Sequence, residues 1–248
     1  MIRAHCLVCA GAGCISSGGN AVKDALAAEL KSRGLDNEIR IVETGCMGPC
    51  DLGPVLLVHP DGTFYQRVSV TEVPKLVEEH FVKGRPYQPL LPKDDRTAAV
   101  VTTQRDFAFF AKQEKIVLEN CGLIDPENIQ EYIARDGYSA LGKVLTEMKS
   151  ADVIAEIKAA GLRGRGGAGF PTGVKWELTA KNPVTPHYVI CNADEGDPGA
   201  FMNRAVLEGD PHKIIEGMAI GGYAMGAHNG YIYIRAEYPL AVKRLQIA

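Results

Sequence analysis

The sequence predicts an α/β protein of two domains. Patterns typical of strands and helices follow one another in the order β-α-β-β-α within the first 85 residues. A segment with three prolines and no apolar periodicity, "GRPYQPLLPKDDRT" (84–97), comes next and has the composition of a linker. Beyond it strand and helix patterns alternate again, which is typical of a second α/β domain. We therefore predict domains over 1–85 and 119–248, joined by a linker and leading helix over 86–118.

The elements of the first domain can be placed individually. Apolar residues at Val22, Leu26 and Leu30 follow helical spacing, and Gly34 is a suitable stop. The Asp61-Gly62 pair between two apolar runs predicts a hairpin turn. In chain order we expect a strand over 1–8, a helix over 20–34, a strand over 38–44, a hairpin over 54–68 and a helix over 71–84.

The second region begins with helical patterns. The helix over 150–161 has Ser150 as its expected N-cap and Gly161 as its expected stop. The stretch "HYVICNADEGDPGAF" predicts a buried strand that runs into an acidic turn. In chain order we expect helical structure over 128–148 and 150–161, a strand from 187, a helix over 210–227 and a strand over 230–239.

Composition and charge narrow the class of protein. Hydrophobic residues make up 46% and charged residues 23%, as in ordinary globular proteins. The net charge of -3 lacks the positive excess that is typical of proteins that bind nucleic acid. No apolar run is long enough for a membrane span, and the start lacks the apolar region of a secretory signal. A cytoplasmic location without nucleic-acid or membrane contact is expected.

Five of the seven cysteines lie within the first 50 residues, which indicates a metal or redox site in a cytoplasmic chain. Cys9-x4-Cys14 and Cys46-x3-Cys50 supply four thiolates in two loop pairs, suited to a [2Fe–2S] cluster. Only Gly and Ala stand between the first two, so main-chain amides can approach sulfur. Two alternatives remain: a zinc ion held by Cys6, Cys9 and the second pair, or inert buried thiols.

These cysteines, on a β-α-β-β-α frame, resemble the thioredoxin-like [2Fe–2S] ferredoxin domain, which also forms the small flavoprotein subunit of respiratory complex I. The resemblance covers about residues 1–90. It implies a [2Fe–2S] cluster on Cys9, Cys14, Cys46 and Cys50, with Cys6 as a non-ligand.

The glycine-rich stretch "RGRGGAGFPTG" (163–173) contains a literal G-x-G-x-x-G from Gly164 to Gly169. A dinucleotide-binding fingerprint needs a strand before it and an acidic residue about 20 positions later. Here a helical pattern precedes the glycines, and Val189, 20 positions after Gly169, is apolar, as are its neighbours; the nearest following acid, Asp194, comes only after the next strand. The fingerprint is therefore rejected. Glycines at this density, flanked by Arg163, Arg165 and Lys175, instead favour main-chain contact with a phosphate or a flat ring.

The acidic turn "NADEGDPG" (192–199) ends an apolar strand, where open α/β sheets bind ligands. Its carboxylates are suited to ribityl or ribose hydroxyls and to ring N–H donors rather than to phosphate. A metal site is a weaker alternative because no histidine joins the acids locally.

Together, 161–176 and 192–204 resemble the flavin subunit of complex I and its relatives, the NAD(P)-linked [FeFe] hydrogenases and NAD-dependent formate dehydrogenases. The resemblance covers about 120–248. It implies that Phe170 lies near the nicotinamide of NAD(H) or NADP(H) and that Asp197 faces its ribose or amide. The FMN ligands that it implies are Gly164, Arg165, Gly166, Gly167, Lys175, Asn192, Asp194, Glu195 and Gly196.

The chain departs from the complex I pattern "NADESEPG" at Gly196 and Asp197, and Leu178 replaces a common aromatic. These departures favour the hydrogenase-type relatives and leave the choice between NADH and NADPH open. The family pattern continues beyond residue 248 with the rest of the flavin pocket and a domain carrying a [4Fe–4S] cluster. We therefore expect a C-terminally truncated chain.

The resemblance implies a diaphorase-type subunit that transfers hydride between NAD(P)H and FMN and single electrons to iron–sulfur clusters. Its expected setting is an electron-bifurcating or NAD(P)-coupled [FeFe] hydrogenase. Expected partners are a hydrogenase-type catalytic iron–sulfur subunit, a small thioredoxin-like [2Fe–2S] subunit and a ferredoxin. The cofactors carry the reaction, so no catalytic side chain is assigned, and Cys191, His187 and His212 are interpreted as structural. Two alternatives stay open: a formate dehydrogenase or complex I flavin subunit, and a non-catalytic electron-relay or docking fragment.

Overall fold

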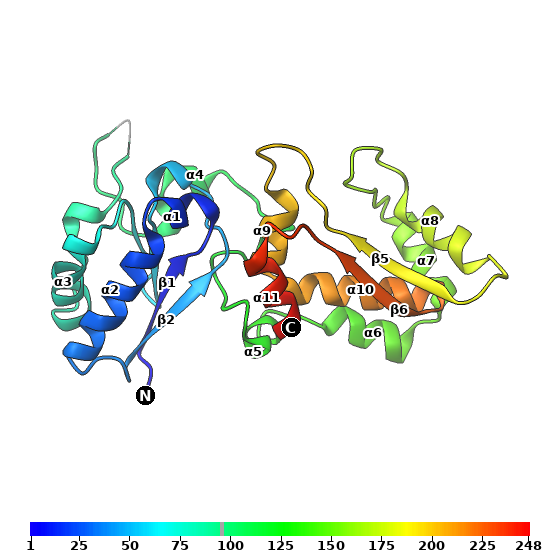
Figure 1. The fold of residues 1–248 in the computed structure, drawn as a ribbon, viewed down its shortest axis with the longest axis horizontal. Coiled ribbons are helices and arrows are strands. Elements are labelled where there is room, and N and C mark those ends of the chain that lie inside the picture. Colours follow the sequence, from blue (N-terminus) through cyan, green and yellow to red (C-terminus); the bar gives the residue numbers. More distant parts are fainter. Residues whose placement is uncertain (95–96) are drawn as a thin grey trace. The chain divides into compact units, whose positions relative to one another are not determined.

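The computed structural model describes residues 1–94 and 97–248, so Asp95 and Arg96 of the predicted linker lie outside the described residues (Figure 1). The chain divides into two compact units, Met1–Pro126 and Glu127–Ala248. The division falls later than the predicted linker, and residues of the segment 86–118 pack on the first unit. The predicted boundaries of the two domains remain predictions.

The first unit is built on a four-stranded sheet in the order β2-β1-β3-β4. β1 runs parallel to β2 and antiparallel to β3, and β3 forms a hairpin with β4 through Gly62, whose φ is +74°. The predicted order of elements is confirmed. The elements are β1 (Ala4–Cys9), α1 (Ala12–Ser16), α2 (Gly19–Ser32), β2 (Ile39–Thr44), β3 (Leu56–His59), β4 (Thr63–Tyr65), α3 (Val73–Leu76), which continues as a π-helix (Val77–Val82), and α4 (Ala108–Ala111).

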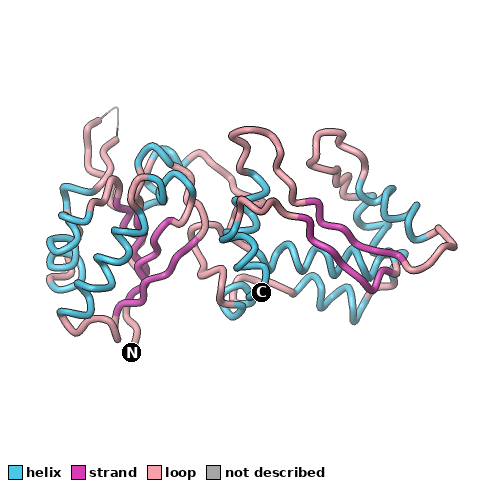
Figure 2. Tube along the Cα trace, viewed as in Figure 1, coloured by secondary structure: helices cyan, strands magenta, loops and turns pink. Residues whose placement is uncertain are grey.

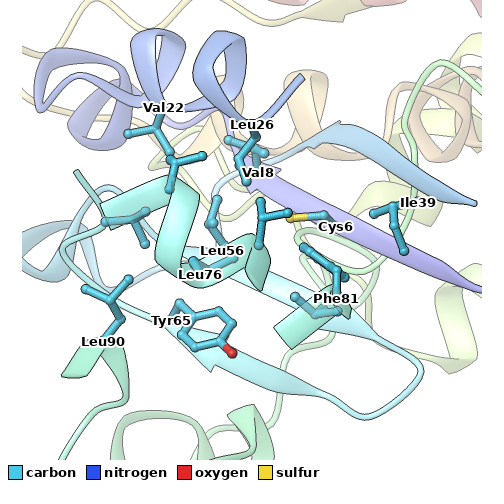
Figure 3. Close-up of a cluster of buried hydrophobic side chains, with 14 of the residues drawn as sticks. Cys6, Val8, Val22, Leu26, Ile39, Leu56, Tyr65, Leu76, Phe81 and Leu90 are labelled. Carbon is cyan, nitrogen blue, oxygen red and sulfur yellow. The ribbon is translucent and has the colours of Figure 1, made fainter. Parts of the chain in front are cut away.

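One face of this sheet is covered by α2 and α3. Alternate residues of β1, Cys6 and Val8, point into this core and meet Leu26 of α2 and Leu76 of α3 (Figure 3). Tyr65 of β4 is fully buried here, and its hydroxyl lies 2.6 Å from Nδ1 of His80. The apolar residues predicted to lie on one face of a helix, Val22, Leu26 and Leu30, therefore do pack in the core between the sheet and its helices.

The opposite face of the sheet carries the other alternate residues, among them Leu7 and Cys9. It is covered in part by residues of the predicted linker and leading helix, 86–118. Phe107 and Phe110 pack on Phe64, with ring centroids 5.9 and 5.6 Å apart. The segment after Pro92 is thus a packed part of this unit. Its aromatic residues explain why, since burying two phenylalanines outweighs the flexibility that the prolines suggested.

The second unit contains a two-stranded parallel sheet of β5 and β6, connected through α10. Figure 2 shows the two strands side by side with helices packed against them. The elements are α5 (Ile129–Ile133), α6 (Ser139–Glu147), α7 (Ser150–Ala159), α8 (Thr172–Ala180), β5 (His187–Asn192), α9 (Met202–Gly209), α10 (Pro211–Met225), β6 (Ala227–Tyr233) and α11 (Pro239–Ile247).

The prediction that β5 is a buried strand is wrong for one of its faces. Tyr188 and Ile190 are 47% and 67% exposed, and Tyr231 and Tyr233 of β6 are exposed beside them. The other face packs on α10, where the small residues Gly221 and Gly222 allow a close approach of Trp176 and Ala227. An apolar run alone does not reveal that only one side of its strand is covered.

Ser150 does not cap α7, contrary to the prediction, because it is already the first residue of the helix. Lys149 occupies the N-cap position, and its amide donates to the carboxylate of Asp152 at 3.2 Å. The Ser150 hydroxyl donates to the main-chain oxygen of Tyr223 at 3.0 Å instead. Gly161, with φ +65°, follows the helix end as predicted.

Candidate functional site

The four predicted cysteine ligands gather at the end of β1 and in the loops after β1 and β2. Cys9 is the last residue of β1, and Cys14 lies in the short helix α1. The sulfurs of Cys46 and Cys50 are 4.0 Å apart, and the thiol of Cys9 interacts with those of Cys14 and Cys46. The structure therefore brings the two predicted pairs together into one site, buried at Cys9 and Cys14 and open to solvent at Cys50.

Glycines around this site make room for the sulfurs. A Cβ on Gly11 would lie 3.0 Å from the sulfur of Cys46, and one on Gly53 would lie 3.1 Å from the sulfur of Cys14. At Gly13 a Cβ would lie 2.9 Å from the Cβ of Cys50. A Cβ on Gly13 would force a shift of Cys50, and Cβ atoms on Gly11 and Gly53 would make unusually tight contacts, so larger residues at these positions would press on the cysteine side chains.

The protonation of the thiols shows how closely they are coupled. The hydrogen bond from the Cys9 thiol lowers the pKa of Cys14, and the same bond raises the pKa of Cys9 to about 11. The pKa of Cys46 is raised, first by its hydrogen bond with Cys9 and then by burial. The main-chain amide of Gly48 acts in the opposite direction on Cys46, as expected of an N–H directed at sulfur.

Cys6 does not belong to this group. It points into the core beneath α2, on the face of the sheet opposite to Cys9, and burial raises its pKa to about 12. A zinc site that uses Cys6 and Cys9 together is therefore contradicted, because residues three apart on a strand face opposite sides. Among the described residues no trio of His, Cys, Asp or Glu is arranged to hold a single metal ion.

The glycine-rich loop connects two helices, α7 and α8, in agreement with the helical pattern that precedes the glycines. Gly167 and Gly169 have φ values of +102° and +61°, which require glycine or a strained residue. Gly164 and Gly166 have no such φ, and a Cβ on Gly166 would meet nothing within 4 Å. Neither backbone conformation nor packing therefore accounts for Gly166.

A cavity of about 590 Å³ lies between α8, β5 and α10. Gly164, Phe170 and Lys175 line it from the loop side, so three of the predicted cofactor residues meet there. Of the described residues around this cavity, none comes from the acidic turn 192–197. The remaining predicted residues of the loop follow Gly164 in the sequence and are exposed. They are Arg165, Gly166 and Gly167.

The acidic turn after β5 is organised by Glu195. Its buried carboxylate accepts hydrogen bonds from the amides of Asn203 and Arg204, at 2.9 and 3.1 Å, at the start of α9. Arg235 donates to the main-chain oxygen of Glu195 at 2.6 Å. Asn192, Asp194, Gly196 and Asp197 are exposed around it. Glu195 thus holds the turn in shape, and the other acids face solvent.

Three residues interpreted as structural have contacts that suit that interpretation. Nδ1 and Nε2 of His187 lie 2.7 and 3.0 Å from main-chain oxygens. The Tyr138 hydroxyl lies 2.9 Å from Nδ1 of buried His212, and burial lowers the pKa of His212. Burial likewise raises the pKa of the Cys191 thiol, which reduces its reactivity.

Two groups of residues near the sites escaped sequence reasoning. Trp176 and Lys213 line the cavity beside Lys175. Phe110 and Lys115 lie against the cysteine loop from the segment predicted to be a linker. The run "DFAFF" (106–110) was the available signal, because three phenylalanines in five residues are unusual in an exposed linker.

The fold and the two sites define a class of protein, in which a small α/β domain with a four-cysteine site precedes an α/β domain with a glycine-lined cavity. Residues 2–80 match the thioredoxin-like [2Fe–2S] ferredoxin family, and residues 157–248 match the Nuo51 FMN-binding domain family. One segment of the chain is therefore similar to each of these two families.

Curated relatives are similar to part of this chain. The HndC subunit of the NADP-reducing hydrogenase of Solidesulfovibrio fructosivorans is 59% identical over 150 residues, which cover 60% of this chain and 29% of that protein. A subunit of the NADH-quinone oxidoreductase of Rhizobium meliloti is 46% identical over 135 residues, covering 54% of this chain and 32% of that protein. The chain thus spans about a third of the length of these relatives, both of which are named as subunits.

Two solved structures resemble this chain in whole or in part. An NAD⁺-reducing [NiFe]-hydrogenase in the air-oxidised state matches 99% of this chain and 40% of its own chain, at 24% identity and a TM-score of 0.44. A thioredoxin-like [2Fe–2S] ferredoxin from Aquifex aeolicus matches 38% of this chain and all of its own, at 29% identity and a TM-score of 0.35. No helix in the described part of the chain is both long and apolar enough to cross a bilayer.

Proposed function

We propose that the first unit holds a [2Fe–2S] cluster on Cys9, Cys14, Cys46 and Cys50. The grouping of the four thiols supports this, as do the glycines that keep side chains away from their sulfurs. Four thiolates on glycine-rich loops are the ligand set that such clusters use. The opening at Cys50 gives the electron an exit toward solvent or a partner.

We propose that the second unit binds FMN in the cavity beside the glycine loop. Lys175 and Arg165 would attract the phosphate, and the loop amides at Gly164, Gly166 and Gly167 would donate to it. Asn192, Asp194, Glu195 and Gly196 would hold the ribityl chain and ring. The free space above Gly166, which the protein itself does not use, supports a ligand in this position.

The nicotinamide nucleotide would bind on the open side of the same cavity. Phe170 is half exposed there and offers a flat apolar surface to the nicotinamide ring. The Asp197 carboxylate is exposed and would accept hydrogen bonds from a ribose or amide. FMN, when bound, accepts a hydride from the nicotinamide and releases electrons one at a time.

We conclude that the chain is best explained as a diaphorase-type flavin subunit that couples NAD(P)H to iron–sulfur electron transfer. The single observation that carries this is the presence of the four-cysteine site and the glycine-lined cavity in one chain. Similarity to the HndC subunit of an NADP-reducing hydrogenase supports an NAD(P)-coupled hydrogenase as the setting. We propose an electron-bifurcating or NAD(P)-coupled [FeFe] hydrogenase in the cytoplasm. Its partners would be a catalytic iron–sulfur subunit, a small [2Fe–2S] subunit and a ferredoxin.

The test is a reconstitution of the full chain with iron, sulfide and FMN, followed by assays of NADH and NADPH with ferricyanide or viologen. Reduction of the acceptor at a rate that depends on FMN supports the proposal. A protein that takes up zinc instead of a coloured cluster, or that binds no flavin, contradicts it.

A second candidate is a non-catalytic electron relay. It is favoured by the lining of the cavity beside the glycine loop, because none of its described residues comes from the acidic turn 192–197 and fewer groups are therefore in place to hold FMN. In that case the reconstituted protein shows an intact cluster that accepts electrons from dithionite but no FMN-dependent acceptor reduction.

A further inference from the structure

The second face of the first sheet and the loop Cys46–Cys50 are covered by one segment, residues 103–124, here called the cap. Its rings at Phe107 and Phe110 pack on Phe64. Its far end is fixed where the Thr44 hydroxyl donates to the main-chain oxygen of Ile124 at 2.8 Å. The cap is therefore attached to the sheet at both ends.

Between these attachments the cap touches the cysteine loop directly. Gly48 has φ +121°, and a Cβ there would lie 3.0 Å from an edge carbon of Phe109. Gly122 has φ +87°, and a Cβ there would lie 2.9 Å from Cγ of Met47, which is fully buried. One glycine on each side thus allows the two segments to approach more closely than side chains would permit.

Lys115 of the cap makes the polar contact with this loop. Its ammonium donates to the main-chain oxygen of Met47 at 3.3 Å and lies 5.2 Å from the ring centre of Phe110. The side chain is half-buried, so the charge is held between the ring and the carbonyl rather than in bulk solvent.

The peptide group that Lys115 contacts lies in the loop between two of the proposed ligands, Cys46 and Cys50. The oxygen of Met47 and the N–H of Gly48 belong to the same peptide bond, and the Gly48 amide is the main-chain group that lowers the pKa of Cys46. A cation at the oxygen end polarises the peptide and strengthens the hydrogen bond that its N–H end donates. The ammonium therefore contacts a peptide bond that begins at the residue after Cys46, in the loop of the proposed ligands.

Both parts of this arrangement act in the same direction on an iron–sulfur cluster. A positive charge close to an anionic cluster favours the form that has gained an electron. Hydrogen bonds to ligand sulfurs also stabilise the more negative, reduced form. Asp51, which follows Cys50 directly in the sequence, acts the other way because its charge is negative.

We propose that Lys115 is a positioning residue that raises the reduction potential of the cluster by polarising the Met47–Gly48 peptide toward Cys46. The inference rests on the proposed [2Fe–2S] cluster and concerns the addition of one electron to it, with no bond made or broken. In this way the cap, which follows the ferredoxin domain in sequence, sets how readily that domain accepts electrons.

The experiment is a potentiometric titration of the reconstituted full chain with dithionite, followed by electron paramagnetic resonance and visible absorption. In Lys115→Gln we expect the ratio of reduced to oxidised cluster to fall about tenfold at the potential where the wild type is half reduced, a shift of about 59 mV for one electron. Lys115→Arg keeps the charge and should stay within about threefold of the wild type. Lys112→Gln removes an exposed charge from the same segment and is the matched control.

The outcomes separate the two proposals. A wild-type chain without a cluster overturns the proposed function, and this inference with it. An intact cluster whose potential is the same in Lys115→Gln and Lys112→Gln overturns the role of Lys115 alone. If Lys115→Gln fails to hold a cluster, the Lys115→Arg variant decides. A ratio of reduced to oxidised cluster that differs more than threefold from the wild type contradicts a role for the charge. A ratio within threefold of the wild type supports that role.

Discussion

Cys6 and Cys9 point to opposite faces of β1, although only two residues separate them. The strand thereby assigns Cys9 to the cysteine site and Cys6 to the core beneath α2. Spacing alone left open a pairing of these two residues, and the alternation of the strand removes it.

The first prediction tests this assignment. Replacing Cys46 by Ala should abolish the visible absorption of the reconstituted cluster, since one of four ligands is lost and Ala offers no replacement. Replacing Cys6 by Ala should leave that absorption unchanged and cost about 1 kcal/mol of unfolding free energy for lost packing. Absorption spectra and iron content measure the first effect, and urea denaturation measures the second. Loss of the cluster in the Cys6 variant would contradict this assignment and would indicate that Cys6 takes part in the metal site together with Cys9.

The second prediction separates binding from folding in the glycine loop. Gly166→Ala should change the unfolding free energy by less than about 0.5 kcal/mol, because its Cβ meets nothing within 4 Å. The same change should weaken FMN binding about tenfold or more, since it fills space reserved for the ligand. Fluorescence titration with FMN and thermal denaturation measure the two quantities.

Gly173→Ala is the matched control in this loop region. Its Cβ would lie 2.8 Å from the main-chain nitrogen of Lys158, so the packing of α7 on α8 must shift. We expect a loss of about 1–3 kcal/mol in stability. If the two variants lose FMN affinity and stability in parallel, the loop has a purely structural role.

The third prediction concerns the acidic turn. Glu195→Ala removes the acceptor for the amides of Asn203 and Arg204 and should destabilise the apoprotein by about 0.5–2 kcal/mol, as expected for a lost helix cap. Asp197→Ala, an exposed position in the same turn, should have an effect below about 0.5 kcal/mol. Thermal denaturation without FMN measures both. Equal melting temperatures for the two variants would contradict the capping role.

The fourth prediction is a pH dependence that arises from His80. Burial lowers the pKa of His80, a trend that Arg3 strengthens and Asp61 opposes. The unfolded chain therefore binds a proton more readily, and the stability contributed by neutral His80 is complete above pH 6.5 and is lost as the pH falls through the folded-state pKa. The loss amounts to about 1.4 kcal/mol for each pH unit of depression.

Denaturation of the wild type and of His80→Gln between pH 7.5 and 5.5 tests this point. The difference in unfolding free energy between the two proteins should shrink toward acidic pH, while the contribution of His212 is common to both and cancels. A difference that does not vary with pH would show that His80 does not titrate in this range.

Sequence reasoning succeeded where local patterns and burial agree. The helical spacing of Val22, Leu26 and Leu30 corresponds to α2, because a single face of this helix is covered. The strand predicted over 38–44 corresponds to β2, which is buried at Ile39 on one face of the sheet and at Val42 on the other. The two cysteine pairs were also found, since residue type and spacing alone restrict what they can bind.

It failed where the covering element is distant in sequence. The coverage of β5 depends on which neighbours lie on its second face, and no pattern within 187–192 records that. The segment 86–118 has the prolines of a linker, yet Phe107 and Phe110 pack on Phe64, more than 40 positions earlier. Lys115 could not be found either, because its partner is a main-chain oxygen, which leaves no trace in the sequence.

The exposed side of the β5–β6 sheet has a consequence for the behaviour of this protein at the bench. Tyr188, Ile190, Tyr231 and Tyr233 form an uncovered apolar strip on a sheet whose two strands are both edges. Such a surface associates with copies of itself as concentration rises. Light scattering of the purified chain should therefore increase with protein concentration, and mild non-ionic detergent should reverse it.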